Sequence, residues 1–298
     1  MQIGKLVVVG VGLIGASCAL ALRAAGAVRE VVGVGRGQPN LDAALARRAV
    51  DRAHRLDGAW TAELADADIV LVAAPVGQYP GVLGAIAPHL DAGFVVTDAG
   101  STKRDVVATA HAAFGARMAR FVPGHPIAGS DRSGASAAEA TLFDGRNVVL
   151  TPVAETAADA TARVAAMWTA CGARVRTLTP DDHDRIFAAV SHLPHLAAFA
   201  LVAELAARPD AAALLGLAGS GFRDFTRIAA SAPEMWRDIA LANRRALREE
   251  IARFRAALDS VDGSLAQGDG AALEALFARA AEARRRWDTL LPVADDGV

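Results

Sequence analysis

Short apolar runs recur through the first half of the chain, and each run is followed by a segment in which apolar residues have helical spacing. The runs are rich in Val and Ile, and they are KLVVV (5–9), VVGV (31–34), DIVLVAAPV (68–76) and the start of VVTDAGSTKRDVV (95–107). Such runs are typical of strands buried on both faces in a parallel sheet. We expect strands at 146–152 and 173–178, with a helix over 156–171, to complete the same sheet.

The pattern changes at Pro180, because the apolar residues that follow have only helical spacing. The clearest series are Leu247, Ile251, Phe254 and Leu258, then Leu273, Leu276, Phe277, Ala280 and Trp287. We therefore predict an α/β domain over residues 1–179 and an all-helical domain over residues 180–298. Long apolar helices attached to a single sheet domain commonly bury their excess surface against a second copy, so we expect a homodimer.

The first predicted strand leads directly into GVGLIG, in which Gly10, Gly12 and Gly15 fit the pattern GxGxxG between a strand and a helix. The first glycine permits the turn, the second lets the backbone approach a pyrophosphate, and the third lets helix and strand pack closely. Amides at the helix start, where Leu13 and Ile14 lie, would donate to the phosphates. The pattern predicts a Rossmann-type dinucleotide-binding domain; a glycine turn in a flavodoxin-like fold is the alternative.

The end of the second predicted strand bears on the choice of cofactor. An acidic residue normally stands there and binds the adenosine ribose hydroxyls, but this chain has Gly35 and Arg36. A glycine leaves space and a guanidinium can pair with a phosphate through two hydrogen bonds, so we predict NADP, with relaxed use of NAD also open. A solvated turn is the alternative role for Arg36. Ala74 and Pro75, after a later strand, are expected to line the cofactor.

The stretch FVPGHPIAGSDRSG at 121–134 combines a short apolar strand with a loop of one histidine, two prolines and three glycines. Glycine lets backbone approach a ligand closely, and a neutral imidazole can accept a proton near pH 7. His125 is therefore the candidate general base. Ser101 follows Gly100 in VVTDAGSTKRDVV (95–107), where a strand is expected to lead into a helix. It is a candidate substrate contact, and Ser101 and Thr102 are also candidate helix caps.

A second polar segment, SHLPH at 191–195, interrupts an apolar helical pattern. Pro194 removes an amide donor and clashes with the carbonyl of Val190, so we expect a bend that frees backbone polar groups. The side chains expected to line a substrate pocket at this bend are Ser191, His192 and His195. Two alternatives stay open: a metal site that also uses residues 182–184, and histidines that serve packing or capping.

Two arginines, Arg223 and Arg227, follow the glycine-rich start of another predicted helix. Side chains four residues apart lie on one helix face, so the pair suits a dicarboxylate substrate. A solvated or salt-bridged face is the alternative. Trp236, after a helix start with proline, is more typical of an interface or a core than of a ligand contact.

Composition and charge limit the partners. The net charge is −2 at pH 7 and the isoelectric point is near 6.4, so no general attraction to nucleic acid or to an anionic membrane is expected. No apolar run reaches the roughly 18 residues that would span a bilayer. The first strand starts within a few residues of Met1, which leaves no room for a signal peptide. We expect a soluble, cytoplasmic protein.

Several of these motifs, taken together and in order, resemble the prephenate/arogenate (cyclohexadienyl) dehydrogenase family. They are GVGLIG, DAGSTK, GHPIAGSDRSG, the pair His183–Asp184, SHLPH, GSGFRDFTRIA and MWRDI, and they cover almost the whole chain. The resemblance implies a Rossmann-type domain followed by an all-α dimerisation domain, a 6-phosphogluconate-dehydrogenase-like arrangement. It also implies oxidative decarboxylation of prephenate or arogenate, with hydride transfer to NADP or NAD, in tyrosine biosynthesis.

The resemblance also implies roles for individual residues. His125 matches the catalytic histidine, Ser101 the serine that hydrogen-bonds the substrate hydroxyl, and Arg227 the arginine that grips a substrate carboxylate. The residues that match other substrate contacts are Ser191, His192, His195 and Trp236, of which the last can reach the partner subunit's site. Asp131 stands where some members have Glu, which shortens any gating ion pair to Arg227. Gly35–Arg36 replaces the Asp of NAD-specific members.

Two other functions are compatible with the predicted fold. β-Hydroxyacid dehydrogenases and imine reductases also join a Rossmann unit to a helical dimer domain. Their usual catalytic lysine has no counterpart in the helical half, since the chain has only Lys5 and Lys103. A non-catalytic sensor of NADP(H) would not need His125, Ser101 and two arginines together. The choice between prephenate and arogenate stays open.

Overall fold

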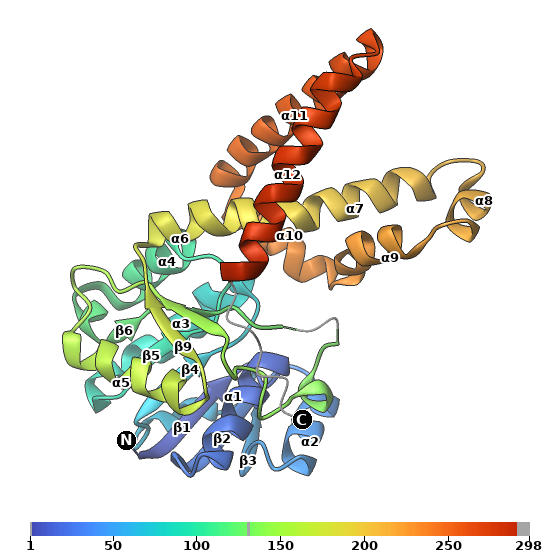
Figure 1. The fold of residues 1–298 in the computed structure, drawn as a ribbon. Coiled ribbons are helices and arrows are strands. Elements are labelled where there is room, and N and C mark those ends of the chain that lie inside the picture. The colour runs from blue at the N-terminus through green and yellow to red at the C-terminus, as the bar shows by residue number, and fades with distance from the viewer. Residues whose placement is uncertain (1, 130–131, 291–298) are drawn as a thin grey trace. The chain divides into compact units, whose positions relative to one another are not determined.

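A six-stranded parallel sheet, in the order β3-β2-β1-β4-β5-β6, forms the centre of the computed structural model, which describes residues 2–129 and 132–290 (Figure 1). Its strands are β1 (Ile3–Val9), β2 (Val28–Gly35), β3 (Arg52–Arg55), β4 (Ile69–Val72), β5 (Val95–Asp98) and β6 (Phe121–Val122). The helices around it are α1 (Leu13–Ala24), α2 (Gln38–Ala46), α3 (Tyr79–Ile86), α4 (Arg104–Phe114) and α5 (Ala158–Ala170). The predicted Rossmann-type fold is confirmed, since the glycine turn joins β1 to α1.

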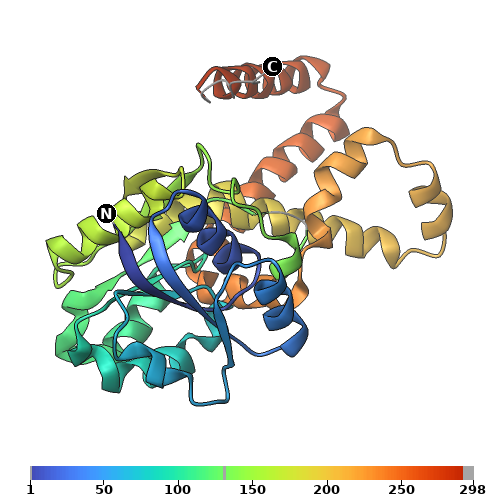
Figure 2. The ribbon, with the colours of Figure 1, turned by 90° about the horizontal axis from the view of Figure 1, so that it is seen from below.

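Alternate residues of β1 point into two separate hydrophobic cores, one on each face of the sheet. Leu6 and Val8 belong to a cluster that includes Trp168 of α5. Val7 and Val9 belong to a cluster formed with residues of α3 and α4. Figure 2 shows helices on both sides of the sheet. This double burial explains why β1 reads as a continuous apolar run instead of an alternating one.

Three further strands form a sheet of their own, in the order β7-β8-β9. They are β7 (Gly124–Pro126), β8 (Asn147–Leu150) and β9 (Arg174–Thr177). The expectation that the last two complete the main sheet is therefore wrong. Pro123, between β6 and β7, has no N–H to donate to a sheet, and after it β7 pairs antiparallel with β8. The chain thus leaves the main sheet just before His125.

All described residues after β9 that have regular secondary structure are helical. The elements are α6 (Pro180–Phe187), the π turn η6 (Ala188–His192), α7 (Leu193–Ala206), α8 (Ala211–Gly216), α9 (Ser220–Thr226), the 3₁₀ turn η7 (Arg227–Ala230), α10 (Pro233–Ala242), α11 (Arg244–Gln267) and α12 (Gly270–Leu290). By contacts between residues, the chain divides into two compact units, Met1–Leu247 and Arg248–Val298. The predicted boundary between the α/β domain and the all-helical domain, at residues 179 and 180, stays a prediction.

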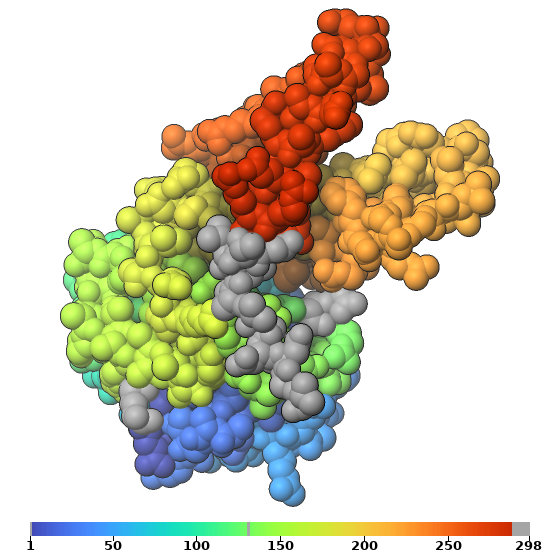
Figure 3. Space-filling model, in the orientation of Figure 1, coloured from blue at the N-terminus to red at the C-terminus, as the bar shows by residue number. Residues whose placement is uncertain are grey.

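A wide helical turn lies just before Pro194, where the sequence predicts a bend. Residues Ala188–His192 form a π turn directly before α7, and Pro194 lies in the first turn of α7. A proline near the start of a helix costs no helix hydrogen bond, because the first backbone N–H groups have no partner within the helix. In the first unit, α7, α8 and α9 form a projection to one side of the sheet-containing body (Figure 3).

The helical run Pro180–Ala206 is, among the described residues, long and apolar enough to cross a membrane by length and composition alone. This corrects the expectation that no segment reaches such a length. The run contains charged and polar residues at its start, so a search for an unbroken apolar stretch misses it. Helices of soluble proteins meet the same criterion, and only 22% of its most apolar window is buried. The run therefore carries apolar surface that the described residues of the chain leave uncovered.

Candidate active site

The glycine turn between β1 and α1 has the shape that a pyrophosphate requires. Gly10 has a φ of +107°, and a Cβ there would lie 2.5 Å from the carbonyl carbon of Ala73. A Cβ at Gly15 would lie 2.2 Å from the carbonyl oxygen of Gly10, whereas one at Gly12 would meet nothing within 4 Å. Gly12 is also the N-cap of α1 and places no side chain over its first amides. The turn is therefore open where phosphate oxygens would approach the helix.

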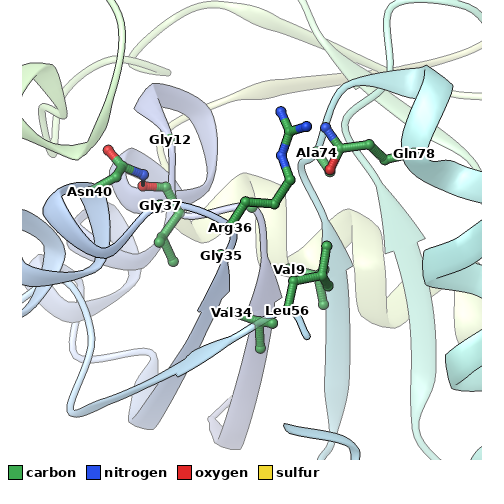
Figure 4. Close-up of a pocket in the computed structure, with 12 residues that line it drawn as sticks. Val9, Gly12, Val34, Gly35, Arg36, Gly37, Asn40, Leu56, Ala74 and Gln78 are labelled. Atoms are coloured by element: carbon green, nitrogen blue, oxygen red, sulfur yellow. Dashed lines mark hydrogen bonds between the residues drawn. The ribbon is translucent and has the colours of Figure 1, made fainter. Parts of the chain in front are cut away.

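A cavity of about 500 Å³ opens over this turn (Figure 4). Its lining residues are Val9, Gly10, Val11, Gly12, Val34, Gly35, Arg36, Gly37, Asn40, Leu56, Ala74 and Gln78. Arg36 is exposed, and its side chain extends toward Gln78 in Figure 4. The predicted residues that do not line the cavity are Leu13, Ile14 and Gly15, which form the start of α1, and Pro75. The residues present fit a dinucleotide.

Two amide side chains at this cavity were not singled out by the sequence. Asn40 Nδ2 donates to the carbonyl oxygen of Val11 at 2.7 Å, and its Oδ1 accepts from the Ala135 N–H at 2.6 Å. Asn40 therefore ties the glycine turn to the loop that follows His125. Gln78 Nε2 is buried without a hydrogen-bond partner among the described residues, so a ligand acceptor would satisfy it.

A buried ion pair holds the backbone just before His125. Lys103 and Asp98 are fully buried, and Lys103 Nζ lies 2.5 Å from Asp98 Oδ2. Lys103 Nζ also donates to the Gly124 carbonyl oxygen at 2.6 Å, while the Gly124 N–H donates to Asp98 Oδ1 at 2.9 Å. Both backbone polar groups of Gly124 are thus fixed. This places His125 at the carboxyl end of β5, on the same sheet edge as the glycine turn.

His125 is the first member of a chain of hydrogen bonds. Its Nδ1 lies 2.8 Å from His183 Nε2, and His183 Nδ1 lies 2.8 Å from Asp184 Oδ1. The rings of His125 and His183 both pack against Phe187, with centroids 5.1 and 4.6 Å away. A donor and an acceptor in series on buried rings fix the orientation of each imidazole.

The chain of hydrogen bonds ends at the start of α4. The carboxylate of Asp184 accepts from the backbone N–H groups of Lys103 at 2.8 Å and Arg104 at 3.0 Å. The expectation that Ser101 or Thr102 caps this helix is therefore wrong, since neither side chain bonds its first amides. A carboxylate from α6 does so instead, because it brings a full negative charge to the positive end of the helix.

The electrostatic surroundings keep His125 neutral. Burial lowers its pKa well below the usual value, and nearby His183, Lys103 and His192 lower it further. Burial also lowers the pKa of His183, against the opposing effect of its hydrogen bond to Asp184. For Asp184, burial alone would raise the pKa, but the hydrogen bonds from His183 and two backbone amides outweigh it and the pKa is lowered. Asp184 is therefore ionised and both histidines are uncharged at pH 7.

His192, in the π turn, is the second buried histidine that faces this region. Its Nδ1 lies 3.2 Å from Asn243 Nδ2, which also donates to the Asp184 carbonyl oxygen at 2.8 Å. Its Nε2 is buried without a partner among the described residues. Burial lowers the pKa of His192 to about 4, and the backbone of Ser101 is close enough to act on it. The structure thus brings Ser101 and His192 together.

His195 and Trp236 form a stacked pair with ring centroids 3.7 Å apart. His195 Nδ1 lies 2.9 Å from the backbone oxygen of Ser191, so this contact uses the Ser191 carbonyl, not its hydroxyl. Burial lowers the pKa of His195, the bond to Ser191 opposes this, and nearby Arg227 lowers it again. Trp236 also lies 6.1 Å from the His192 ring, measured between centroids. The SHLPH segment, Trp236 and Arg227 therefore gather in one place.

The two predicted substrate-binding arginines lie at the surface. Arg223 is exposed on α9, and Arg227, which directly follows that helix, is also exposed. Asp131 lies outside the described residues. Within residues 2–129 and 132–290, no three His, Cys, Asp or Glu side chains are grouped as metal ligands. Lys103 is fully paired with Asp98 and Gly124, so it is not the free catalytic lysine of the β-hydroxyacid dehydrogenase alternative.

Comparisons with known proteins cover both halves of the chain. Residues 18–177 match the family described as prephenate dehydrogenase, nucleotide-binding domain, and residues 179–279 match prephenate dehydrogenase, dimerization domain. The chain is 32% identical to the cyclohexadienyl dehydrogenase of Zymomonas mobilis over 281 residues, which are 94% of each protein.

Solved structures agree with this result. The prephenate dehydrogenase of A. aeolicus, in complex with hydroxyphenyl propionate and NAD+, has a TM-score of 0.86 and 31% identity, covering 96% of this chain and 99% of that one. The arogenate dehydrogenase of Synechocystis has a TM-score of 0.78 and 32% identity, covering 95% and 99%.

Proposed function

The chain belongs to the prephenate dehydrogenase family, and from this premise we propose that it oxidatively decarboxylates prephenate, arogenate or both in tyrosine biosynthesis. It is an oxidoreductase whose dinucleotide cavity fits NAD(P). The observation that carries the proposal is a neutral, buried histidine, His125, at the sheet edge where the glycine turn lies, directly after a glycine whose backbone is held by a buried ion pair.

In the proposed reaction, His125 removes the proton of the substrate's ring hydroxyl. The carbon that bears this hydroxyl loses a hydride, which the oxidised nicotinamide accepts when it is bound. The ring carboxylate then leaves as carbon dioxide, and its bonding electrons complete the aromatic ring. The proton on His125 can return to the phenolate oxygen or pass to solvent. Aromatisation supplies the driving force, so the protein needs mainly to orient the hydroxyl and accept its proton.

Other residues bind and orient the substrate in this proposal. Ser101 hydrogen-bonds the hydroxyl beside His125, and Arg227 pairs with a substrate carboxylate, with Arg223 on the preceding turn. Ser191, His192 and His195 supply the polar lining, and Asp131, which lies outside the described residues, is the proposed ion-pair partner of Arg227. Trp236 packs on His195 and supports that wall. Arginine binding must not favour the carboxylate so strongly that decarboxylation slows, because uniform binding does not lower the barrier.

The proposed function is tested by initial rates of NADP and NAD reduction with purified protein, each with prephenate and with arogenate. We expect turnover with at least one of the two substrates, and the ratio of rates identifies the preferred one. Folded protein that reduces neither cofactor with either substrate would refute the proposal. In that case cofactor binding without turnover would favour the sensor alternative.

We propose NADP as the preferred cofactor, with NAD also used, because of Arg36. Its guanidinium lines the cavity at the end of β2, where a ribose 2′-phosphate would lie. The acidic residue that normally binds the ribose hydroxyls at this position is absent from the sequence. Asn40 and Gln78 lie at the same cavity and add neutral hydrogen-bonding groups.

Arg36→Ala is expected to raise the KM for NADP by roughly 10- to 100-fold and to leave the KM for NAD within about twofold. The loss corresponds to a charge-assisted hydrogen bond of about 1.5–3 kcal/mol. The measurement is a pair of cofactor titrations at saturating substrate. Arg29→Ala is the matched control, since Arg29 is an exposed arginine near the other end of β2. Equal changes for the two cofactors would contradict recognition of the 2′-phosphate.

We propose a cytoplasmic homodimer formed through the helical part of the chain. Large apolar side chains are exposed on its helices, and they include Leu201, Leu215, Phe225, Leu258 and Phe277. Isolated exposed apolar residues are common, but a series along several helices marks an interface. The match to a dimerization domain over residues 179–279 supports the same interpretation.

Light scattering after gel filtration is expected to give twice the chain mass of 30.7 kDa. The double variant Leu258→Asp, Phe277→Asp should shift the mass toward a monomer, because two buried charges at an interface are unfavourable. Leu45→Asp serves as the control, since Leu45 is an exposed leucine on α2 in the sheet domain. A monomeric wild-type protein would refute the dimer.

A further inference from the structure

In the series of hydrogen bonds from His125 through His183 to Asp184, the donor and the acceptor of each bond follow from the chemistry of the side chains. An ionised carboxylate only accepts hydrogen bonds, so His183 Nδ1–H must donate to Asp184 Oδ1 at 2.8 Å. A neutral His183 with its proton on Nδ1 has a lone pair on Nε2. That lone pair faces His125 Nδ1 at 2.8 Å, so His125 must donate there. Neutral His125 then carries its own lone pair on Nε2, the nitrogen left for a substrate proton.

Asn243 separately determines which ring nitrogen of His192 accepts a hydrogen bond and which one carries the proton. The carbonyl oxygen of Asp184 only accepts, so the nitrogen of the Asn243 amide, not its oxygen, must face it at 2.8 Å. The same Nδ2 lies 3.2 Å from His192 Nδ1, which must therefore accept. Neutral His192 then carries its proton on Nε2. This N–H is buried near the backbone of Ser101 and makes no hydrogen bond of normal geometry among the described residues, so a ligand acceptor would satisfy it.

We propose that His183 and Asn243 are positioning residues that set opposite tautomers in His125 and His192. His125 presents a lone pair, and His192 presents an N–H. The two rings belong to one hydrogen-bond network, because Asn243 contacts His192 and the backbone of Asp184, and His183 contacts Asp184 and His125. A hydroxyl satisfies both rings at once, because its proton goes to His125 while its oxygen accepts from His192. The inference rests on the proposed role of His125 as the base, and it adds His192 as a donor to the oxygen that is losing its proton.

The opposite tautomers have a consequence for catalysis. As the hydroxyl loses its proton, negative charge grows on its oxygen, and an N–H aimed at that oxygen stabilises the charge. Positive charge grows on His125 at the same time. The hydrogen bond to His183, backed by the ionised Asp184, stabilises that charge without a further proton transfer. A wrong tautomer at either ring would place two N–H groups, or two lone pairs, against the same hydroxyl.

The direct test is the ¹⁵N spectrum of protein labelled at histidine, because protonated and unprotonated imidazole nitrogens resonate far apart. Signals are assigned by their loss in His125→Asn and His192→Asn. We expect the Nδ1–H form for His125 and the Nε2–H form for His192. The reverse form at either ring would overturn the proposal. This readout does not need turnover, so it stays separate from a failure of the proposed function.

Kinetics supply the second test, with two replacements of His183. Phenylalanine fills the space but cannot accept from His125, so His183→Phe should lower kcat about 10- to 100-fold with KM within about threefold. Glutamine can accept through Oε1 and donate through Nε2, so His183→Gln should recover most of that loss. In His183→Phe the ¹⁵N signals of His125 should show a mixture of tautomers.

Two results would assign His183 a purely structural role. One is equal impairment of the phenylalanine and glutamine variants with the His125 tautomer unchanged, and the other is full activity of His183→Phe. Thermal unfolding and NADP binding of each variant check that the fold is retained. For the second ring, Asn243→Leu should convert His192 to a mixture of tautomers while His125 keeps its Nδ1–H form. A His192 signal that does not change would refute the role of Asn243.

Discussion

His125→Asn is expected to lower kcat by about 10²–10⁴-fold, the usual contribution of a general base, while the KM for the substrate changes little. Asparagine keeps a polar side chain that can still bond His183, but it cannot take the hydroxyl proton. The ion pair that fixes Gly124 is untouched by this change, so the backbone should stay in place. Steady-state rates at saturating cofactor give both parameters.

The same experiment includes a pH profile and a control. The groups that face His125 are His183, Lys103 and His192, and burial with these neighbours lowers its pKa below 6.5. A base is active when it is neutral, so kcat/KM of the wild type should stay level from pH 8 to below pH 6.5 and fall only at lower pH. His111→Asn, at an exposed histidine of α4, should leave the rates unchanged. An unaltered kcat in His125→Asn would remove His125 from the mechanism.

Arg227→Ala is expected to raise the KM for the substrate by roughly 10- to 100-fold and to change kcat by less than about threefold. A charged hydrogen bond to a carboxylate contributes about 1.5–3 kcal/mol, and it acts equally in the ground state and the transition state. Arg227 lies next to His195, where it lowers the pKa of that ring, so the expected carboxylate would sit beside the SHLPH segment.

Arg227→Lys is the matched variant, since it keeps the charge but loses the planar fork of donors. We expect a KM between those of the wild type and the alanine variant. If the alanine substitution instead lowered kcat and kcat/KM equally, Arg227 would act only in the transition state and not as a binding group. A double variant with His125→Asn should show additive effects, because binding and proton transfer are separate roles.

Much of the first domain could be predicted from the sequence because its determinants are local. A run of β-branched residues forms a buried strand, Gly10 is required by its own φ of +107°, and Gly15 is required by its contact with the carbonyl oxygen of nearby Gly10. The effect of Pro194 is also local, since its missing N–H acts within one helical turn, and the π turn Ala188–His192 lies within that distance. His125 was singled out by its glycine-rich loop.

The partners of His125 could not be found in this way. Asp184 caps α4 through amides 81 and 80 residues earlier in the chain, and His183 reaches His125 across 58 residues. Asn243 binds both His192 and the backbone of Asp184 from the end of α10. The adjacent residues His183 and Asp184 could be recognised as a motif in the sequence. A motif gives the residue types, but it does not show which nitrogen of one side chain faces which atom of another.

The sequence by itself determined the dinucleotide turn, the class of each half and the candidate base, since steric limits and hydrophobic spacing act between near neighbours. Only the tertiary structure decided that β7, β8 and β9 form a separate sheet, that Lys103 and Asp98 clamp Gly124, and that a distant carboxylate caps α4. These features depend on where the folded backbone brings remote polar groups within about 3 Å, and hydrogen bonds at that range are set by the path of the chain and not by local pattern.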